Sequence, residues 1–365
     1  MTVAGDGAGG WVLGIDSGGS GVRFALGRAD GGAPSEVSLR DEPVRTGRAG
    51  IDAGQLLARL VPAARELLDR TGAGRVAAVA VGAAGMASLG DDLRARLPAG
   101  LAGALGVRRL ALAADAVTAY AGALGQRPGA VVAAGTGMVA LGTDLTRWRR
   151  ADGWGHLLGD CGGGAWIGRA GLEAALRAHD GRPGGSTALL TRAEALFGPV
   201  AELPGLLYPR TDRPAVLASF APEVARCAPS DPVAAAVLRG AARAIAESAA
   251  AVCPDVPPAR GEGHVRGPGP GTADDSGASG AAHDGAAESV SECEVALTGG
   301  LFRMGDPLLV PVQEELDALL PSVRRVPAAG DPLAGALLIA SALARDELRL
   351  PHHPRMLWVT TERDT

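Results

Sequence analysis

Apolar and polar residues follow one another along this chain in blocks whose period alternates between that of strands and that of helices. Apolar runs at 11–15 and 22–26 flank a glycine-rich turn, and this arrangement predicts a β-hairpin. The periodicity then predicts a helix at 53–69, a strand at 76–81, a helix at 91–105, a strand at 110–114 and a helix at 116–124. The first part of the chain is therefore expected to form an α/β unit that begins with a hairpin.

A second strand–turn–strand unit begins roughly 120 residues after the first. Apolar strands at 130–134 and 138–142 flank the sequence Gly135-Thr136-Gly137. Further helices are expected at 165–178, 186–197, 231–252, 307–319 and 332–348, and further strands at 294–298 and 322–326. Hairpins combined with crossover helices predict α/β domains with mixed sheets. The distance between the two units favours a duplicated fold over a short-period repeat, and the cleft between two such domains is the expected ligand site.

Residues 254–293 interrupt this pattern. They are rich in Gly, Ala, Pro, Ser and Asp and contain almost no large apolar residues. Such a segment buries too little apolar surface to offset its chain entropy, so it predicts a disordered surface insertion. The insertion could be a recognition tail, but a passive loop is the simpler interpretation.

The composition excludes several functional classes. The chain has 365 residues, enough for two domains, and 47% of them are hydrophobic. Its net charge of -5 gives no sign of a nucleic-acid or anionic-membrane partner. It has neither a signal sequence nor an uncharged apolar stretch of about 20 residues, which predicts a cytoplasmic protein. All 35 Lys and Arg residues are Arg, so the lysine that a Walker A phosphate loop requires is absent.

The cysteines predict no covalent framework. Cys161, Cys227, Cys253 and Cys293 are scattered and match neither a disulfide pattern nor a paired CxxC metal site. Reduced thiols are therefore expected.

The two glycine-rich turns are candidate phosphate-binding loops. The first follows a buried strand and reads Asp16-Ser17-Gly18-Gly19-Ser20-Gly21, and the second is Gly135-Thr136-Gly137. Glycines allow backbone N–H groups to approach phosphate oxygens, and a turn of successive N–H groups makes an anion-binding concavity. Asp16 is placed to hold the water shell of a Mg²⁺ ion. Either turn alone could be a plain hairpin, but two at the starts of similar halves could hold a triphosphate from both sides.

Asp115 is the candidate general base. It follows the strand at 110–114 and opens the next helix. A carboxylate at that place can be a helix N-cap, or it can lie in the cleft and accept a proton from a sugar hydroxyl. Phosphoryl transfer requires little more of the protein than positioning, charge neutralisation and such a base.

A third glycine-rich block has the residue types of a sugar site. Residues 152–169 contain seven glycines, and Trp154, Gly155, His156 and Asp160 lie in its first half. Glycine allows backbone contact with a small polar ligand, Trp offers an apolar face, and Asp accepts hydrogen bonds from hydroxyls. His156 has no second His or Cys at ligand spacing, which argues against a metal site. Farther along, a buried strand ends in Thr298-Gly299-Gly300-Leu301, which suits the close approach of adenine or ribose, or is an ordinary strand-to-helix turn.

The order of these motifs, with the Gly-Trp-Gly-His block, resembles the N-acetylglucosamine kinase branch of the BadF/BadG/BcrA/BcrD ATPase family, within the superfamily of actin, hexokinases and heat-shock ATPases. The resemblance spans about residues 10–348, apart from the insertion. It implies an α/β fold of two actin-like (ribonuclease H-like) domains with mixed sheets around an interdomain cleft. The domains would be residues 10–117, with helix 332–348 packed back on them, and residues 118–331.

The resemblance also assigns roles. Asp115 would be the catalytic base, and Gly155, His156 and Asp160 would contact the sugar. The nucleotide would contact both phosphate turns and the adenosine motif, that is Asp16, Gly18, Gly19, Ser20, Gly21, Gly135, Thr136, Gly137, Thr298, Gly299, Gly300 and Leu301. Cys161 and Gly163 stand where the family often has Glu and Ser, and the chain has no Asn to contact the sugar, so Arg45, Thr46 or Arg48 are the expected substitutes.

The sequence thus predicts ATP- and Mg²⁺-dependent phosphorylation of the 6-hydroxyl of N-acetylglucosamine or a related amino sugar. A homodimer is common in such families and is the candidate assembly. Two other functions remain open. One is an ATPase that activates a partner enzyme, which is disfavoured because the second cysteine near the nucleotide region is lacking. The other is a sugar or nucleotide sensor without catalysis.

Overall fold

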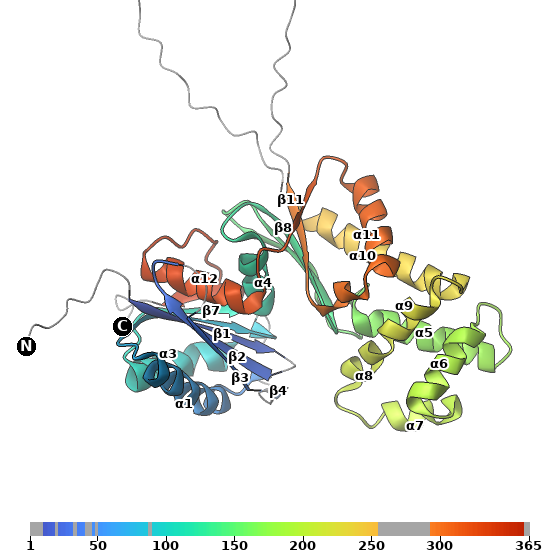
Figure 1. Cartoon of the computed structure of the whole chain (residues 1–365), viewed down its shortest axis with the longest axis horizontal. Helices are drawn as coiled ribbons and strands as arrows, with labels where there is room; N and C mark the ends of the chain where they lie inside the picture. The colour runs from blue at the N-terminus through green and yellow to red at the C-terminus, as the bar shows by residue number, and fades with distance from the viewer. Residues whose placement is uncertain are drawn as a thin grey trace, which may run out of the picture.

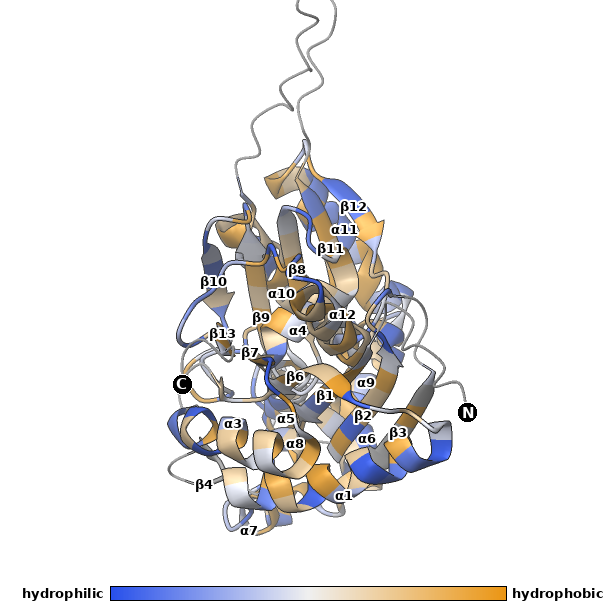
Figure 2. Cartoon of the chain, turned by 90° about the vertical axis from the view of Figure 1, so that its left-hand side faces the viewer, coloured by the Kyte–Doolittle hydropathy of each residue, from blue (hydrophilic) through white to orange (hydrophobic). Residues whose placement is uncertain are grey.

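The computed structural model describes residues 10–18, 21–31, 35–40, 46–47, 50–86, 90–254 and 293–360. These residues form two main sheets that lie side by side, each covered by helices (Figure 1). Figure 2 shows hydrophobic residues along the central strands, whereas the outer helix α1 (Ala53–Thr71) carries both hydrophilic and hydrophobic residues. The apolar side of α1 is buried through Leu56, Leu60 and Leu67, which explains its amphipathic pattern.

The first sheet has six strands in the order β13-β7-β6-β1-β2-β3. Its strands are β1 (Trp11–Gly18), β2 (Gly21–Arg28), β3 (Glu36–Arg40), β6 (Val76–Ala83), β7 (Leu110–Ala114) and β13 (Leu357–Thr360). β1 pairs antiparallel with β2 and parallel with β6, and β6 pairs parallel with β7. α1 and α3 (Asp91–Leu105) lie below this sheet in Figure 1, and α12 (Pro332–Ala344) lies above it.

The second sheet has five strands in the order β10-β9-β8-β11-β12. Its strands are β8 (Gly129–Ala134), β9 (Met138–Thr143), β10 (Trp148–Asp152), β11 (Glu294–Thr298) and β12 (Arg324–Pro327). The first three are antiparallel, and β8, β11 and β12 are parallel, which repeats the arrangement of β3, β2, β1, β6 and β7 in the first sheet. The prediction of a duplicated α/β fold with mixed sheets is therefore confirmed.

Helices surround the second sheet and extend beyond it. α10 (Pro232–Val252) packs against β8, β9 and β10, and α11 (Asp306–Leu319) packs against α10. A helical region projects at the far end of this half (Figure 1), made of α5 (Gly164–His179), α6 (Thr187–Phe197), α7 (Leu203–Leu207), α8 (Arg213–Ser219) and α9 (Ala221–Cys227). Short elements complete the described residues, namely β4 (Thr46–Gly47), β5 (Gly50–Ile51), η1 (Val200–Glu202) and η2 (Gly300–Met304).

Helix α4 (Asp115–Leu124) joins the two halves. It contacts β1, β6 and β7 of the first sheet and β8, β9 and β11 of the second, and every residue from 116 to 124 is buried. α12 crosses α4 at very short range because glycines lie at the crossing. A Cβ atom on Gly335 would lie 1.9 Å from the Thr118 carbonyl oxygen, and one on Gly122 would lie 2.1 Å from the Asp331 oxygen. The position of Asp115 is thus fixed relative to both sheets.

The predicted elements agree closely with the structure, and the differences lie in short segments. β3, β10, β13 and the helices α7, α8 and α9 were not predicted, and α12 ends at Ala344 rather than 348. α12 packs against β1 and β6. The predicted boundary between the two domains, after residue 117, falls within α4. The domain ranges 10–117 and 118–331 therefore remain a proposal.

Residues 255–292, nearly all of the proposed disordered insertion, lie outside the described residues. Within the described ranges, no helix combines the length and apolarity needed to cross a bilayer.

The expectation of reduced thiols is wrong for two cysteines. Cys253 and Cys293 form a disulfide across a sequence separation of 40 residues, whereas Cys161 and Cys227 are free. Cys253 follows α10 and Cys293 precedes β11. The pairing could not be predicted because it is the packing of α10 on the second sheet that brings these two distant residues together.

Removing this disulfide should lower the stability of the fold. Closing a loop of 40 residues reduces the entropy of the unfolded chain by an amount worth about 4 kcal/mol at most. We expect a reducing agent to lower the Tm of the wild-type protein, measured by thermal unfolding, and to leave the Tm of a C253S/C293S double variant unchanged. C161S is the matched control and should respond to the reductant as the wild type does. Equal wild-type Tm values with and without reductant would contradict the prediction.

Candidate active site

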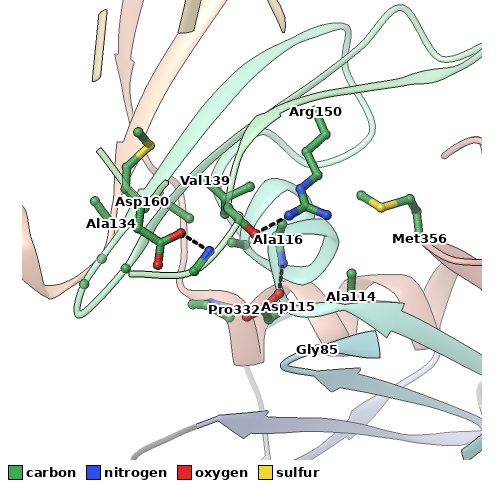
Figure 3. Close-up of a pocket in the computed structure, with 18 residues that line it drawn as sticks. Gly85, Ala114, Asp115, Ala116, Ala134, Val139, Arg150, Asp160, Pro332 and Met356 are labelled. Carbon is green, nitrogen blue, oxygen red and sulfur yellow. Dashed lines mark hydrogen bonds between the residues drawn. The ribbon is translucent and has the colours of Figure 1, made fainter. Parts of the chain in front are cut away.

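A cavity of about 410 Å³ lies between the two sheets (Figure 3). From the first half and the connecting helices it is lined by Gly85, Ala114, Asp115, Ala116, Ala119, Pro332 and Met356. From the second half it is lined by Ala133, Ala134, Gly135, Gly137, Met138, Val139, Arg150, Gly153, Gly155, Asp160 and Gly299. Segments far apart in the chain thus enclose one space.

Strand register explains why the polar groups of the first half meet at one edge. In the parallel set, Ser17 is paired with Ala83, and Ala83 with Ala114, so the strands end at the same level. Asp16 and Asp115 therefore lie near the same edge of the sheet, which faces the cavity through Gly85 and Asp115. Carboxyl ends of parallel strands are the usual place for ligand sites in α/β sheets.

Asp115 lies at the floor of the cavity and its side chain is accessible from it. Its Oδ1 accepts a hydrogen bond from the Ala116 N–H at 2.9 Å (Figure 3). The N-cap position of α4 is occupied by Ala114, which has no side-chain cap, so the interpretation of Asp115 as a helix N-cap is not supported. The pKa of Asp115 is raised chiefly by desolvation and further by the negative charge of Asp16, against the Ala116 hydrogen bond and the positive charge of Arg150. The group is suited to accept a proton.

The second glycine turn is held rigidly against the start of α5. Its Gly135 and Thr136 carbonyl oxygens accept hydrogen bonds from Gly164 and Ala165 at 2.9 and 2.8 Å. Beside it, Thr298 of β11 is paired with Ala133 of β8. The next residue, Gly299, approaches so closely that a Cβ atom would lie 2.1 Å from the Ala134 oxygen. Gly135, Gly137 and Gly299 thus share one wall of the cavity.

The loop after β10 is organised by two aspartates. Asp152 accepts hydrogen bonds from Asp160 N at 2.6 Å and Cys161 N at 2.9 Å, and Asp160 accepts one from Gly155 N at 2.9 Å. Both aspartates have positive φ, 58° and 55°, a conformation that costs about 1–3 kcal/mol and requires support from the surroundings. A Cβ atom on Gly137 would lie 2.3 Å from the Asp160 carboxylate. The loop therefore holds Asp160 directly over the second turn.

Arg150 is a residue of the cavity that the sequence analysis missed. It comes from β10, which was not predicted, and its guanidinium points into the cavity (Figure 3). Asp152 was likewise not singled out for its role in holding the loop. Neither has a sequence signal of its own, because the roles depend on the pairing of β10 with β9 and on the loop conformation.

The structure brings together part of the predicted site. Asp115, Gly135, Gly137, Gly155, Asp160 and Gly299 line the cavity. Predicted residues that are described and do not line it are Asp16, Gly21, Thr136, Trp154, His156, Thr298, Gly300 and Leu301. Of these, Trp154 is 68% exposed and Leu301 is buried in the apolar core of the second half. Gly19, Ser20, Arg45 and Arg48 lie outside the described residues.

Gly300 instead lines a second cavity of about 470 Å³, with Arg226 of α9, Arg303 and Met304 among its neighbours. Gly299 lines the first cavity and Gly300 the second, so the strand end at 298–301 borders both spaces.

Asp16 is already paired with a cation. Arg23 donates to Asp16 Oδ2 from Nε and Nη2 at 3.1 and 2.6 Å, and its Nη1 donates to Asp331 Oδ2 at 2.5 Å. No cluster of three or more acidic, His or Cys side chains suited to a metal exists among the described residues. A Mg²⁺ ion held through Asp16 would therefore take most of its ligands from phosphate and water, as Mg²⁺ commonly does.

The fold is that of known sugar kinases and related proteins. The structure of a protein named "putative N-acetylglucosamine kinase" from Chromobacterium violaceum superimposes with a TM-score of 0.59 at 24% identity, covering 92% of this chain and 98% of that one. A protein of the same designation from Porphyromonas gingivalis gives 0.60 at 15% identity, with 92% and 99% covered. A ROK family glucokinase from Streptomyces griseus, in complex with glucose and AMPPNP, gives 0.51 at 18%, with 92% and 100% covered. At these identities the similarity defines the fold alone, and it confirms the two-domain actin-like architecture.

The chain belongs to the BadF/BadG/BcrA/BcrD ATPase family, whose sequence profile matches residues 13–308. One relative is an N-acetylmuramic acid/N-acetylglucosamine kinase from Clostridium acetobutylicum, 42% identical over 69 residues. The matched part spans 19% of this chain and 22% of that relative, about a fifth of its length.

Proposed function

We propose that this protein phosphorylates the 6-hydroxyl of N-acetylglucosamine or a related amino sugar with ATP as the donor. The observation that carries the proposal is the position of Asp115 in a cavity between the two halves, opposite the second glycine turn and the loop of Asp160. Membership of the ATPase family and the sugar kinases of the same fold support it.

In the proposed reaction, Asp115 accepts the proton of the sugar 6-hydroxyl. The oxygen attacks the γ-phosphorus of ATP in line, the new O–P bond forms, and the bond from the γ-phosphorus to the departing ADP oxygen breaks. The raised pKa of Asp115 makes it a stronger base than an ordinary carboxylate. Most of the remaining catalysis is positioning and charge neutralisation by the protein.

The nucleotide is proposed to lie along the second turn and the strand end at 298–301. Gly135, Gly137 and Gly299 offer backbone at the cavity wall for the phosphates, and the cavity lined by Gly300, Arg226 and Arg303 would take the adenosine. The first turn, through Gly18, Gly19, Ser20 and Gly21, would hold the phosphates from the other sheet. Asp16 would hold Mg²⁺ through water, and the bound ion would neutralise phosphate charge.

The acceptor sugar is proposed to lie against the loop after β10. Gly155 and Asp160 line the cavity there, and Asp160 retains one carboxylate oxygen beyond the bond from Gly155 for a sugar hydroxyl. Trp154, which is exposed, and His156, which is half-buried, lie on the same loop but do not line the cavity, so they would reach the sugar only if the two halves close.

A coupled ADP-release assay tests this function. We expect turnover with ATP, Mg²⁺ and an amino sugar, at a kcat/KM well above that for glucose when N-acetylglucosamine, glucosamine, N-acetylmannosamine and glucose are compared. Calorimetric binding of sugar or nucleotide without any turnover would favour a sensor instead. Iron and a brown colour in the purified protein would favour an activator of a partner enzyme. Failure of every sugar to accept phosphate would refute the kinase proposal.

A further inference from the structure

The loop after β10, residues 153–161, is held by polar contacts and not by apolar packing. Its large apolar side chains remain in solvent, since Trp154, Leu157 and Leu158 are 68%, 77% and 85% exposed. Burial of apolar surface is the main force that orders a folded chain, and this loop makes little use of it. Hydrogen bonds must therefore fix its shape, and Asp152, which directly precedes it, accepts several of them.

The Asp152 carboxylate binds the backbone at the far end of this loop. Its Oδ1 accepts a hydrogen bond from Asp160 N at 2.6 Å, and its Oδ2 accepts one from Cys161 N at 2.9 Å. Gly159 allows this close approach, because a Cβ atom there would lie 2.3 Å from Asp152 Oδ1. Hydrogen bonds to an ionised acceptor are about twice as strong as those between neutral groups. One side chain thus closes the loop on itself.

Asp152 is itself fixed to the second sheet. It is the last residue of β10 and is paired with Val139 of β9. Its carbonyl oxygen also accepts a hydrogen bond from Arg150 Nε at 3.0 Å. Val139 follows Gly137 by two residues, so the same strand pairing places both the second glycine turn and the start of the loop. The contacts of the Asp152 carboxylate therefore fix the loop relative to that turn.

Asp160 is the cavity residue that these contacts position. Its Oδ1 accepts a hydrogen bond from Gly155 N at 2.9 Å (Figure 3). Its Oδ2 lies so close to the second turn that a Cβ atom on Gly137 would be 2.3 Å away. All three of these residues line the cavity, whereas Asp152 does not. Any effect of Asp152 on a ligand must therefore pass through the residues that it holds.

We propose that Asp152 is a positioning residue for the acceptor, which holds Asp160 where its carboxylate binds a hydroxyl of the sugar. This inference rests on the proposed kinase function. The nucleotide should depend much less on Asp152, because the second turn has its own support in the hydrogen bonds from Gly164 N and Ala165 N. Loss of the Asp152 carboxylate should thus impair acceptor binding and spare donor binding.

Replacing Asp152 with asparagine removes half of this contact at nearly constant size. The amide has a single oxygen, so its NH₂ group must face either Asp160 N or Cys161 N, a donor opposite a donor. The test uses the full chain and the sugar with the highest kcat/KM in the ADP-release assay. We expect D152N to lower that kcat/KM by about 10- to 100-fold, mainly through KM for the sugar. The calorimetric Kd of a non-hydrolysable ATP analogue should change by less than about threefold.

A double-mutant cycle with D160N tests whether Asp152 acts through Asp160. Asparagine tolerates the positive φ of residue 160, so D160N should keep the loop conformation and lose the carboxylate. In a chain that already carries D160N, D152N should lower kcat/KM by less than about threefold, because the group that it positions is gone. Fully additive losses would overturn the inference, since Asp152 would then act independently of Asp160.

D144N is the matched control. Asp144 caps the turn between β9 and β10 in a similar way, with its Oδ1 accepting from Thr146 N at 2.8 Å and Arg147 N at 3.0 Å, but it does not line the cavity. This variant should keep the wild-type kcat/KM. G159A disturbs the Asp152 contact from the other side and should reproduce the selective rise in KM for the sugar. It decides the matter should D152N fail to fold.

The remaining outcomes separate this inference from the kinase function. A wild-type KM for the sugar in D152N would refute the role of Asp152 and leave the kinase function intact. Equal losses of sugar and nucleotide affinity would assign Asp152 a general structural role and would also overturn the inference. If the wild type binds a sugar without phosphorylating it, a calorimetric loss in D152N that D160N masks would support the role of Asp152 although the kinase function fails. If no sugar binds, both proposals are refuted.

Discussion

Replacing Asp115 with asparagine should lower kcat for sugar phosphorylation by about 100- to 10,000-fold, because a positioned general base contributes this much to a proton-transfer step. The amide oxygen of the new side chain can still accept the hydrogen bond from Ala116 N, so the start of α4 should keep its geometry. Nucleotide affinity, measured by calorimetry with a non-hydrolysable ATP analogue, should change little. D317N, which alters an exposed carboxylate on α11, is the control and should keep full activity. Loss of nucleotide binding together with activity would assign Asp115 a structural role.

The raised pKa of Asp115 adds a dependence on pH. A general base must be ionised, and desolvation, followed by the charge of Asp16, favours the protonated form. Activity should therefore decline as the pH falls, at a pH higher than the ordinary carboxyl pKa of about 4 would give. A profile of kcat/KM against pH measures this, and an acid limb at the ordinary carboxyl pKa would contradict it.

The same shift predicts that D115N is more stable than the wild type. A carboxyl group with a raised pKa in the folded state contributes stability below its unfolded pKa, and this contribution is lost as the pH rises through the folded pKa. At neutral pH the ionised Asp115 thus destabilises the fold, and the neutral amide removes that cost. The Tm of D115N should exceed that of the wild type near pH 8, and the difference should shrink as the pH is lowered. Residues that serve catalysis often carry such a stability cost.

Sequence patterns predicted the parts of this protein that depend on local chemistry. The run of apolar residues at 110–114 ends in a carboxylate that opens a helix, and the structure places that carboxylate in the cavity. Glycines at 135 and 137 likewise predicted a tight turn at the edge of a sheet, where they are found. Both features follow from residue type and spacing within one segment.

The missed features depend on contacts between distant segments. β10 (Trp148–Asp152) has no alternation of buried and exposed positions, so its sequence did not predict a strand. For the same reason Arg150 was not identified as a candidate site residue. β13 is four residues long and forms the edge of the first sheet by pairing with β7. The disulfide between Cys253 and Cys293 requires the packing of α10 to be known. The charge relation of Arg150 to Asp115 also appears only when the two halves face each other.

The crossing of α4 and α12 fixes the position of α4, which begins at Asp115, and Gly335→Ala tests this role of the crossing. Its Cβ atom would lie 1.9 Å from the Thr118 oxygen and 2.5 Å from the Gly122 nitrogen. Both are backbone atoms that cannot rotate away, so the two helices must separate. We expect a loss of about 3 kcal/mol in the free energy of unfolding, at the upper end of overpacking effects. Because α4 begins at Asp115, kcat should fall as well.

Gly103→Ala is the matched control for this substitution. Gly103 lies inside α3, and a Cβ atom there would meet nothing within 4 Å. Ala favours a helix interior over Gly by about 1 kcal/mol, so this variant should be slightly more stable than the wild type. Denaturant unfolding of the two variants separates the general effect of Gly to Ala from the effect at the crossing. If Gly335→Ala unfolds at the wild-type denaturant concentration, α12 does not fix α4, and the position of Asp115 must depend on the sheets alone.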